Sequence, residues 1–177
     1  MLGYVAYIPS TNEIAVVFRG TNQDANWWTN LDTIRQDYPY GTGSKVHEGF
    51  YNAYLNLSDD IFYFLEQHML DYPNATILVT GHSLGGAMAT FAALSAIRSY
   101  PSKVVTLYTF GSPRVGNLDF SAYAIRTFGT NKYMRVTHYD DIVPHCPSYE
   151  TYMFNHAGEE VWFDDPGNKL TAYLCQN

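Results

Sequence analysis

The segment from Thr76 to Thr90, TILVTGHSLGGAMAT, contains a serine in a pattern that suits nucleophilic catalysis. Ser83 stands between Gly81 and Gly85 in the order G-x-S-x-G. A β-branched apolar run typical of a buried strand precedes it, and small apolar residues typical of a packed helix follow it. This order predicts a sharp strand-turn-helix bend that presents the serine hydroxyl, with glycines where strand and helix come too close for side chains. The alternative is a glycine-rich turn with an incidental serine.

A serine that hydrolyses esters needs a base to take its proton, an acid to orient that base, and donors for the oxyanion. The first free amides of the helix after the bend point to where an oxyanion would form. In α/β hydrolases the triad follows the chain order serine, carboxylate, histidine. Asp140 and Asp141 lie in a loop after a predicted strand that follows Ser83, so they are the best carboxylate candidates. A solvated acidic turn is the other interpretation of this pair.

The base is harder to identify from the sequence. By chain order and distance, His156 is the only internal candidate. The remaining histidines precede the carboxylates or lie too close to them: His47, His68, His82, His138 and His145. Of these, His47 and His68 lie near the two ends of a long predicted helix and suit structural or exposed positions.

Strand and helix patterns alternate along the chain. Strands are predicted over residues 3–8, 13–19, 76–80, 103–110 and 132–137, and one short strand at most over 154–163. From about residue 47 to before Pro73, apolar residues recur at spacings of three and four, which predicts a long amphipathic helix. A second helix is predicted after the bend, and Asn117 can cap a third that runs to about Phe128. The alternation predicts an α/β domain with a largely parallel sheet. It places Asp140 and Asp141 just beyond a strand's carboxyl end, where open α/β sheets hold their working residues.

Composition narrows the possible functions. The 177 residues are 46% hydrophobic and 16% aromatic, which suits one domain with a compact core. A net charge of −7 without a basic cluster argues against nucleic acid and anionic membranes as partners. No apolar run approaches the ~20 residues of a membrane span, and the start of the chain lacks a signal-peptide pattern.

Two cysteines and two glycosylation sequons say little about the compartment. Cys146 and Cys175 could pair with each other or with cysteines outside this chain. The sequons at Asn56 and Asn74 favour secretion only slightly.

Over nearly its full length the chain resembles the fungal-type class 3 (triacylglycerol) lipases of the α/β-hydrolase superfamily. Separate matches in the same order carry the resemblance: VFRGT at 17–21, NW at 26–27 with NL at 30–31, HEGF at 47–50, TGHSLGGA at 80–87, FGSPRVGN at 110–117 and DIVP at 141–144.

The resemblance implies an α/β-hydrolase fold and hydrolysis of lipid esters with no cofactor and no metal. It makes Ser83 the nucleophile and Asp141, rather than Asp140, the triad acid. Thr21 matches the residue whose amide and hydroxyl form half of the oxyanion hole, and the amide of Leu84 supplies the other half. A lipid ester, met at a lipid-water interface, is the implied partner. The protein is expected to be a monomer that is secreted or lies in a secretory or lysosomal compartment.

The resemblance also matches residues 22–31 to the family's lid, with Trp27 as its tryptophan and Trp28 beside it. In similar lipases the base lies several tens of residues after the DIVP loop, whereas His156 matches a structural histidine. We therefore expect residues 1–177 to be a single α/β-hydrolase domain, a fragment that lacks the family's N-terminal helices and C-terminal histidine segment. Alone, this fragment is expected to be nearly inactive.

Two alternatives remain open at this point. A phospholipase or acyltransferase shares every catalytic part and differs only in the shape of its pocket. A catalytically dead lipid-binding relative, or a truncated gene product, belongs to a different functional class.

Overall fold

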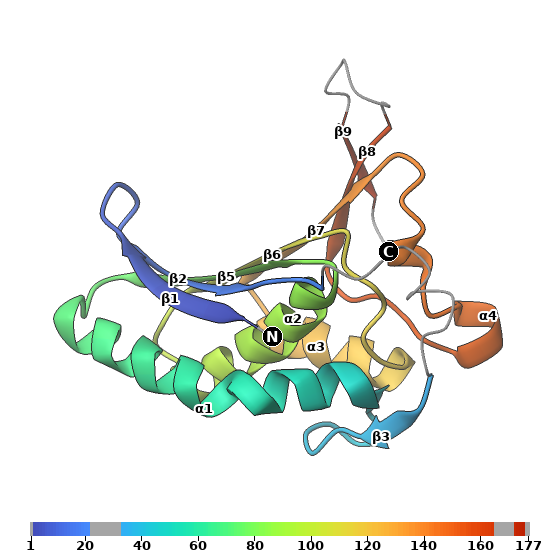
Figure 1. The fold of residues 1–177 in the computed structure, drawn as a ribbon, viewed down its shortest axis with the longest axis horizontal. Coiled ribbons are helices and arrows are strands. Elements are labelled where there is room, and N and C mark those ends of the chain that lie inside the picture. Colours follow the sequence, from blue (N-terminus) through green and yellow to red (C-terminus); the bar gives the residue numbers. More distant parts are fainter. Residues whose placement is uncertain (1, 22–32, 165–171, 176–177) are drawn as a thin grey trace.

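A computed structural model describes residues 2–21, 33–164 and 172–175, and within them seven strands form one sheet in the order β1-β2-β5-β6-β7-β8-β9 (Figure 1). The strands of this sheet are β1 (Gly3–Ile8), β2 (Glu13–Phe18), β5 (Thr76–His82), β6 (Val105–Phe110), β7 (Lys132–His138), β8 (Glu159–Phe163) and β9 (Ala172–Cys175). The other described elements are the hairpin β3 (Arg35–Asp37) and β4 (Lys45–His47), the helices α1 (Glu48–Asp71), α2 (Leu84–Ser99), α3 (Leu118–Phe128) and α4 (Tyr149–Tyr152), and the 3-10 turn η2 (Val143–His145).

The centre of the sheet is parallel and both edges are antiparallel. Strands β2, β5, β6, β7 and β8 run in one direction, while β1 pairs with β2 and β9 with β8 in the opposite sense. Each parallel step includes a crossover, which is what parallel neighbours require. The predicted α/β domain with a largely parallel sheet is confirmed.

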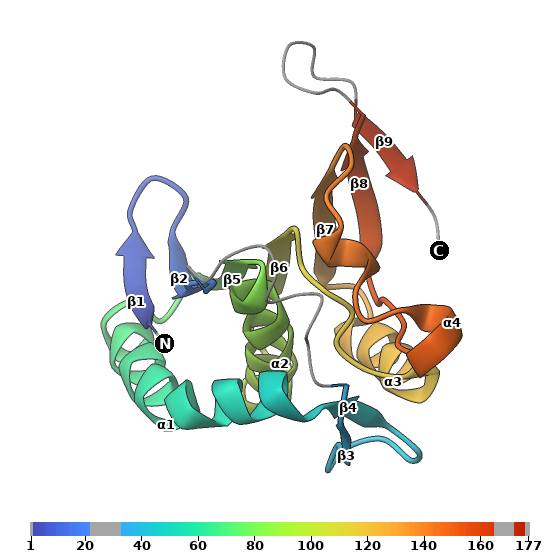
Figure 2. The same cartoon turned by 45° about the vertical axis from the view of Figure 1, so that its right-hand side comes forward.

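Helices α1, α2 and α3 lie on one face of the sheet, as both views show (Figures 1 and 2). Helix α2 packs against β5, β6, α1 and α3, and for this reason nearly every residue from Gly85 to Ala96 is buried. On β5, Ile77 and Val79 are buried, whereas Leu78 and Thr80 alternate with them and are only half-buried. No helix of the described residues covers this second face. No described helix is long and apolar enough to cross a membrane.

Helix α1 follows the predicted amphipathic pattern. His47 is its N-cap, and the imidazole Nδ1 accepts a hydrogen bond from the Phe50 amide at 3.4 Å and stacks on the Phe50 ring. Phe50, Tyr54, Ile61 and Leu65 are buried at the spacing that the sequence predicts. The sequence predicts that His47 is structural or exposed, and the structure shows that it is buried and structural.

The described strands differ from the predictions in a few places. The one short strand expected over 154–163 is present as β8, but the sequence pattern does not predict β9, which pairs with it. Three of the four β9 residues are exposed and the strand has a single described neighbour, so no burial pattern marks it. Strand β6 begins at Val105, two residues later than predicted.

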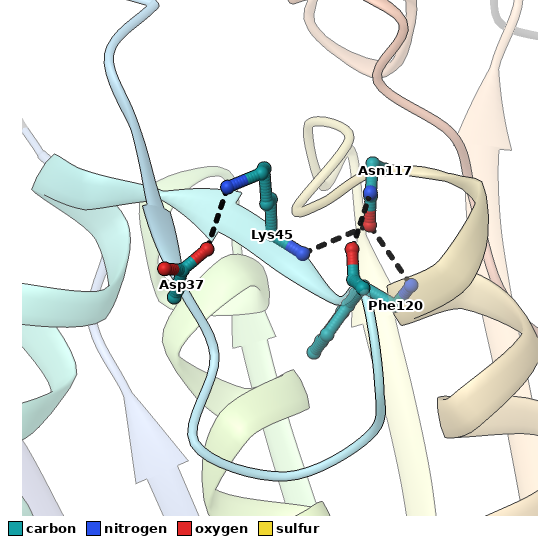
Figure 3. Close-up of polar contacts among 5 residues, drawn as sticks. Asp37, Lys45, Asn117 and Phe120 are labelled. Carbon is teal, nitrogen blue, oxygen red and sulfur yellow. Dashed lines mark hydrogen bonds and ion pairs between the residues drawn. The ribbon is translucent and has the colours of Figure 1, made fainter.

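Asn117 joins the start of α3 to the β3-β4 hairpin (Figure 3). Its side-chain oxygen accepts from the Phe120 amide at 3.0 Å and from the Lys45 amide at 2.9 Å. Its side-chain nitrogen donates to the Gly43 carbonyl at 2.9 Å. The predicted helix cap is confirmed, and it also fixes the chain that precedes α1.

We expect Asn117→Ala to lower the free energy of unfolding by about 1–3 kcal/mol, because two backbone amides lose their acceptor. Asn117→Asp keeps the acceptor and should recover most of the loss. The matched control is Asp37→Ala, which removes an exposed ion pair to Lys45 in the same hairpin and should change stability by less than about 0.5 kcal/mol. Urea denaturation measures all three variants, and equal losses in Asn117→Ala and Asp37→Ala would contradict the assignment.

Candidate active site

The predicted strand-turn-helix bend is present between β5 and α2. Ser83 lies at its tip with φ 57° and ψ −127°, a region that a residue with a side chain occupies only under strain. The Ser83 amide donates to the Phe110 carbonyl at 2.9 Å, which ties the bend to the end of β6. The bend is therefore held in a conformation that the serine itself disfavours.

Two glycines let strand and helix meet at this bend. A Cβ placed on Gly81 would lie 2.2 Å from the Gly85 carbonyl oxygen, and one on Gly85 would lie 2.2 Å from the carbonyl oxygen of Phe18. Both distances are far inside van der Waals contact. The physical reason predicted for these glycines is confirmed.

Ser83 occupies the N-cap position of α2, yet its side chain makes no capping hydrogen bond to the described first turn of that helix. The Ser83 hydroxyl therefore does not cap the helix, unlike the Asn117 side-chain oxygen at the start of α3. Ser83 is more buried than the sequence suggests, with only 5% of its surface exposed. The neighbouring chain lies close on either side of Ser83. After β2, a Cβ on Gly20 would lie 3.3 Å from the Ser83 Cβ, and at the end of β6 the Phe110 carbonyl accepts from the Ser83 amide.

The structure places both predicted oxyanion donors next to the bend. Leu84 is the first residue of α2, so its amide is among those that have no partner within the helix. Gly20 touches the bend, since a Cβ there would lie 2.6 Å from the His82 carbonyl oxygen, and Thr21 follows it directly. Thr21 and His82 line one cavity of about 380 Å³ at the carboxyl ends of β2, β5 and β6.

Asp141 lies beside the same bend, and Asp140 does not share its surroundings. One Asp141 oxygen, Oδ1, accepts from the Val143 amide at 2.9 Å. The other, Oδ2, is only 2.7 Å from where a Cβ on Gly111 would stand, and His82 Nε2 is 3.5 Å from the same point. Asp141 is half-buried, whereas Asp140 is exposed.

Gly111 is part of the site that sequence reasoning does not single out. Its φ of +53° favours glycine, and any side chain there would displace the Asp141 carboxylate. Two signals could have identified it: it is a glycine directly after the strand that ends at Phe110, and it belongs to the FGSPRVGN match.

His156, the internal candidate for the base, is already engaged elsewhere. Its Nε2 lies 2.7 Å from the Pro144 carbonyl oxygen, which can only accept, so Nε2 carries the proton. Burial, and then the nearby Arg135 guanidinium, hold the pKa of His156 well below its usual value. His156 is thus a neutral imidazole whose Nε2 proton is bound to the backbone.

The remaining candidates from the sequence are the two cysteines, possible metal ligands and the predicted lid tryptophans. Cys146 and Cys175 are both free thiols. Among the described residues, no group of three or more His, Cys, Asp or Glu side chains is arranged to hold a metal ion. Trp27 and Trp28, the predicted lid residues, lie outside the described part of the chain.

Similar proteins of known structure share this fold. A crystal structure of lipase from Rhizopus microsporus var. chinensis superimposes with a TM-score of 0.91 at 32% identity, covering 98% of this chain and 60% of that one. Because such structural neighbours are fungal lipases, the predicted α/β-hydrolase fold is confirmed.

Curated relatives are similar in sequence as well. A lipase of Rhizomucor miehei is 38% identical over 174 residues, which are 97% of this chain and 47% of that protein. The secreted mono- and diacylglycerol lipase 1 of Fusarium solani is 36% identical over 162 residues, 91% of this chain and 47% of that protein. The chain thus spans about half the length of the curated relatives it matches.

The sequence model that describes class 3 lipases matches residues 15–151, which include the bend, the Thr21 segment and the Asp141 turn. This match covers most of the chain and contains each part of the site described above. The chain therefore belongs to the class 3 lipase family.

Proposed function

We propose that the protein is a serine esterase that hydrolyses acylglycerols or related lipid esters. The observation that carries the proposal is the arrangement at the bend. Ser83 has a strained backbone and a hydroxyl that does not cap α2, the Leu84 amide at the start of α2 lies next to it, and the Asp141 carboxylate lies against Gly111. These groups supply the nucleophile, the oxyanion donor and the acid that acyl transfer to a serine requires besides a base.

In the proposed reaction, Ser83 Oγ attacks the ester carbonyl carbon while a histidine takes the hydroxyl proton. The Leu84 amide and Thr21 hold the negative charge that forms on the carbonyl oxygen. Asp141 orients the histidine and stabilises its charged form. The proton then passes to the leaving alcohol, and water attacks the acyl-enzyme by the same steps to release the fatty acid and free the serine.

We assign the base to a histidine outside the described residues. His156 is a poor candidate because its Nε2 proton is bound to Pro144. His82 precedes the nucleophile directly, and neighbouring residues at a strand end direct their side chains to opposite faces. Relatives about twice as long as this chain leave ample room for such a residue.

Acylglycerols and secretion are the more specific parts of the proposal. The name of the Fusarium solani relative, a secreted mono- and diacylglycerol lipase, supports both. Turnover of monoacyl-, diacyl- and triacylglycerol emulsions, compared with that of a phospholipid, would identify the substrate class.

We expect Ser83→Ala in the full-length protein to abolish p-nitrophenyl ester turnover, leaving only the small residual rate that the oxyanion donors and binding provide. Ser102→Ala, at an exposed position in the turn before β6, is the matched control and should keep wild-type activity. Steady-state kinetics measure both variants. Substantial turnover by Ser83→Ala would remove Ser83 from the mechanism.

Neutralising the triad acid should be nearly as damaging. We expect Asp141→Asn to lower kcat by about 10⁴-fold, because an amide no longer stabilises the charged base. Asp140→Asn removes the adjacent, exposed carboxylate and should leave kcat within about twofold of wild type. If Asp140→Asn were the more damaging change, the two roles would have to be exchanged.

The lowered pKa of His156 predicts a pH-dependent stability. Below about pH 6.5 the unfolded chain protonates this imidazole while the folded chain does not, so the free energy of unfolding falls as the pH falls from 6.5 towards the lowered pKa. His156→Gln cannot take up a proton, and its stability should decline less over this interval. Urea denaturation between pH 5 and pH 7.5 tests this, and parallel curves for the two proteins would refute it.

A further inference from the structure

The turn that carries the acid is held by an unusual run of hydrogen bonds. Within η2 and directly after it, the carbonyl oxygens of four successive residues, 144–147, all accept from donors outside the turn. Those donors come from only two residues, Arg114 and His156. Irregular turns commonly leave such carbonyls to solvent, so this run of donors holds the turn more firmly than its own sequence would.

Arg114 supplies most of these hydrogen bonds. Its backbone amide donates to the Cys146 carbonyl at 2.8 Å. Its guanidinium Nη1 donates to the carbonyls of His145, at 2.5 Å, and Pro147, at 2.9 Å. One residue in the loop after β6 thus binds three successive carbonyls of the turn after β7.

His156 closes the run at Pro144, and its own backbone is fixed from two sides. The Ser121 hydroxyl of α3 donates to the His156 carbonyl. The neighbouring Asn155 amide donates to the Gly116 carbonyl at 2.7 Å, which joins the His156 segment to the Arg114 loop. The two donor segments therefore hold each other as well as the turn between them.

The turn transmits this restraint to the acid. The His145 amide donates to the Ile142 carbonyl and the Cys146 amide to the Val143 carbonyl, each at 3.0 Å. The Val143 amide in turn donates to Asp141 Oδ1 at 2.9 Å. A fixed η2 turn thus fixes the donor that orients one oxygen of the Asp141 carboxylate.

From this geometry we infer that Arg114 and His156 are positioning residues for the Asp141 carboxylate. The inference rests on the proposed function, in which Asp141 orients the base. Neither side chain needs to contact substrate or the reacting atoms, because both act through the backbone of the 142–147 turn. A shift of the acid by about 1 Å would be enough to impair proton transfer without altering substrate binding.

The test compares four variants in the full-length protein. His156→Phe and Arg114→Met remove the side-chain donors, while His156→Gln keeps an N–H near the position of Nε2. Tyr54→Phe is the matched control, because it removes a part-buried side-chain hydrogen bond to Ser95, at 2.9 Å, between α1 and α2.

We expect His156→Phe and Arg114→Met to lower kcat for p-nitrophenyl esters by about 10- to 100-fold, with KM within about twofold of wild type. His156→Gln should return kcat to within about threefold of wild type. Tyr54→Phe should lower Tm and leave kcat within about twofold. The inference is overturned if His156→Phe and Arg114→Met lower kcat no more than Tyr54→Phe does. It is also overturned if the two variants raise KM as much as they lower kcat.

A second measurement does not depend on activity. Amide hydrogen exchange at Val143, His145 and Cys146 should be faster by about tenfold or more in His156→Phe and Arg114→Met, and unchanged in Tyr54→Phe. If the wild-type protein proves inactive on every ester, the proposed function fails, and exchange at these amides still tests whether the two residues hold the turn. Unchanged exchange in both variants would refute the positioning role even in an active enzyme.

Discussion

The close approach of β5 and α2 is the constraint on which the site depends. Backbone atoms of Gly81, Gly85 and Phe18 come so near one another that no side chain fits between them. This contact requires a sharp bend between strand and helix, and Ser83 lies at its tip with a hydroxyl that does not cap α2. It also brings the end of β2, and with it Thr21, against the same bend.

The remaining parts reach the bend from neighbouring strands of the parallel sheet. The segment after β2 brings Gly20 and Thr21, and the segments after β6 and β7 bring Gly111 and Asp141. Parallel strands all end at one edge, so residues far apart in sequence meet without long insertions. Each contribution is short, and its position depends on backbone contacts more than on flexible side chains.

Much of this arrangement could be predicted from the residues themselves. The G-x-S-x-G pattern between a strand and a helix identifies Ser83, and apolar spacing gives the bounds of α1 and α3 within a residue or two. Strand β9 could not be predicted, because it is a strand through its pairing with β8 and its residues show no burial pattern. Spacing alone leaves Asp140 and Asp141 equivalent, and the resemblance favours Asp141. In the structure, the hydrogen bond from the Val143 amide and the space at Gly111 distinguish the two. The positioning role of Arg114 and His156 could not be predicted from the sequence either. Both donate to backbone carbonyls, which every residue has, so no residue pattern marks their partners.

The positive φ at Ser83 makes the residue that the reaction needs unfavourable for the stability of the fold. Strain of this kind opposes folding by about 1–3 kcal/mol. Glycine would relax it, because glycine adopts such angles freely, but glycine has no hydroxyl. A library of variants sorted only for folding would therefore drift away from serine at residue 83, and only selection on turnover would keep it.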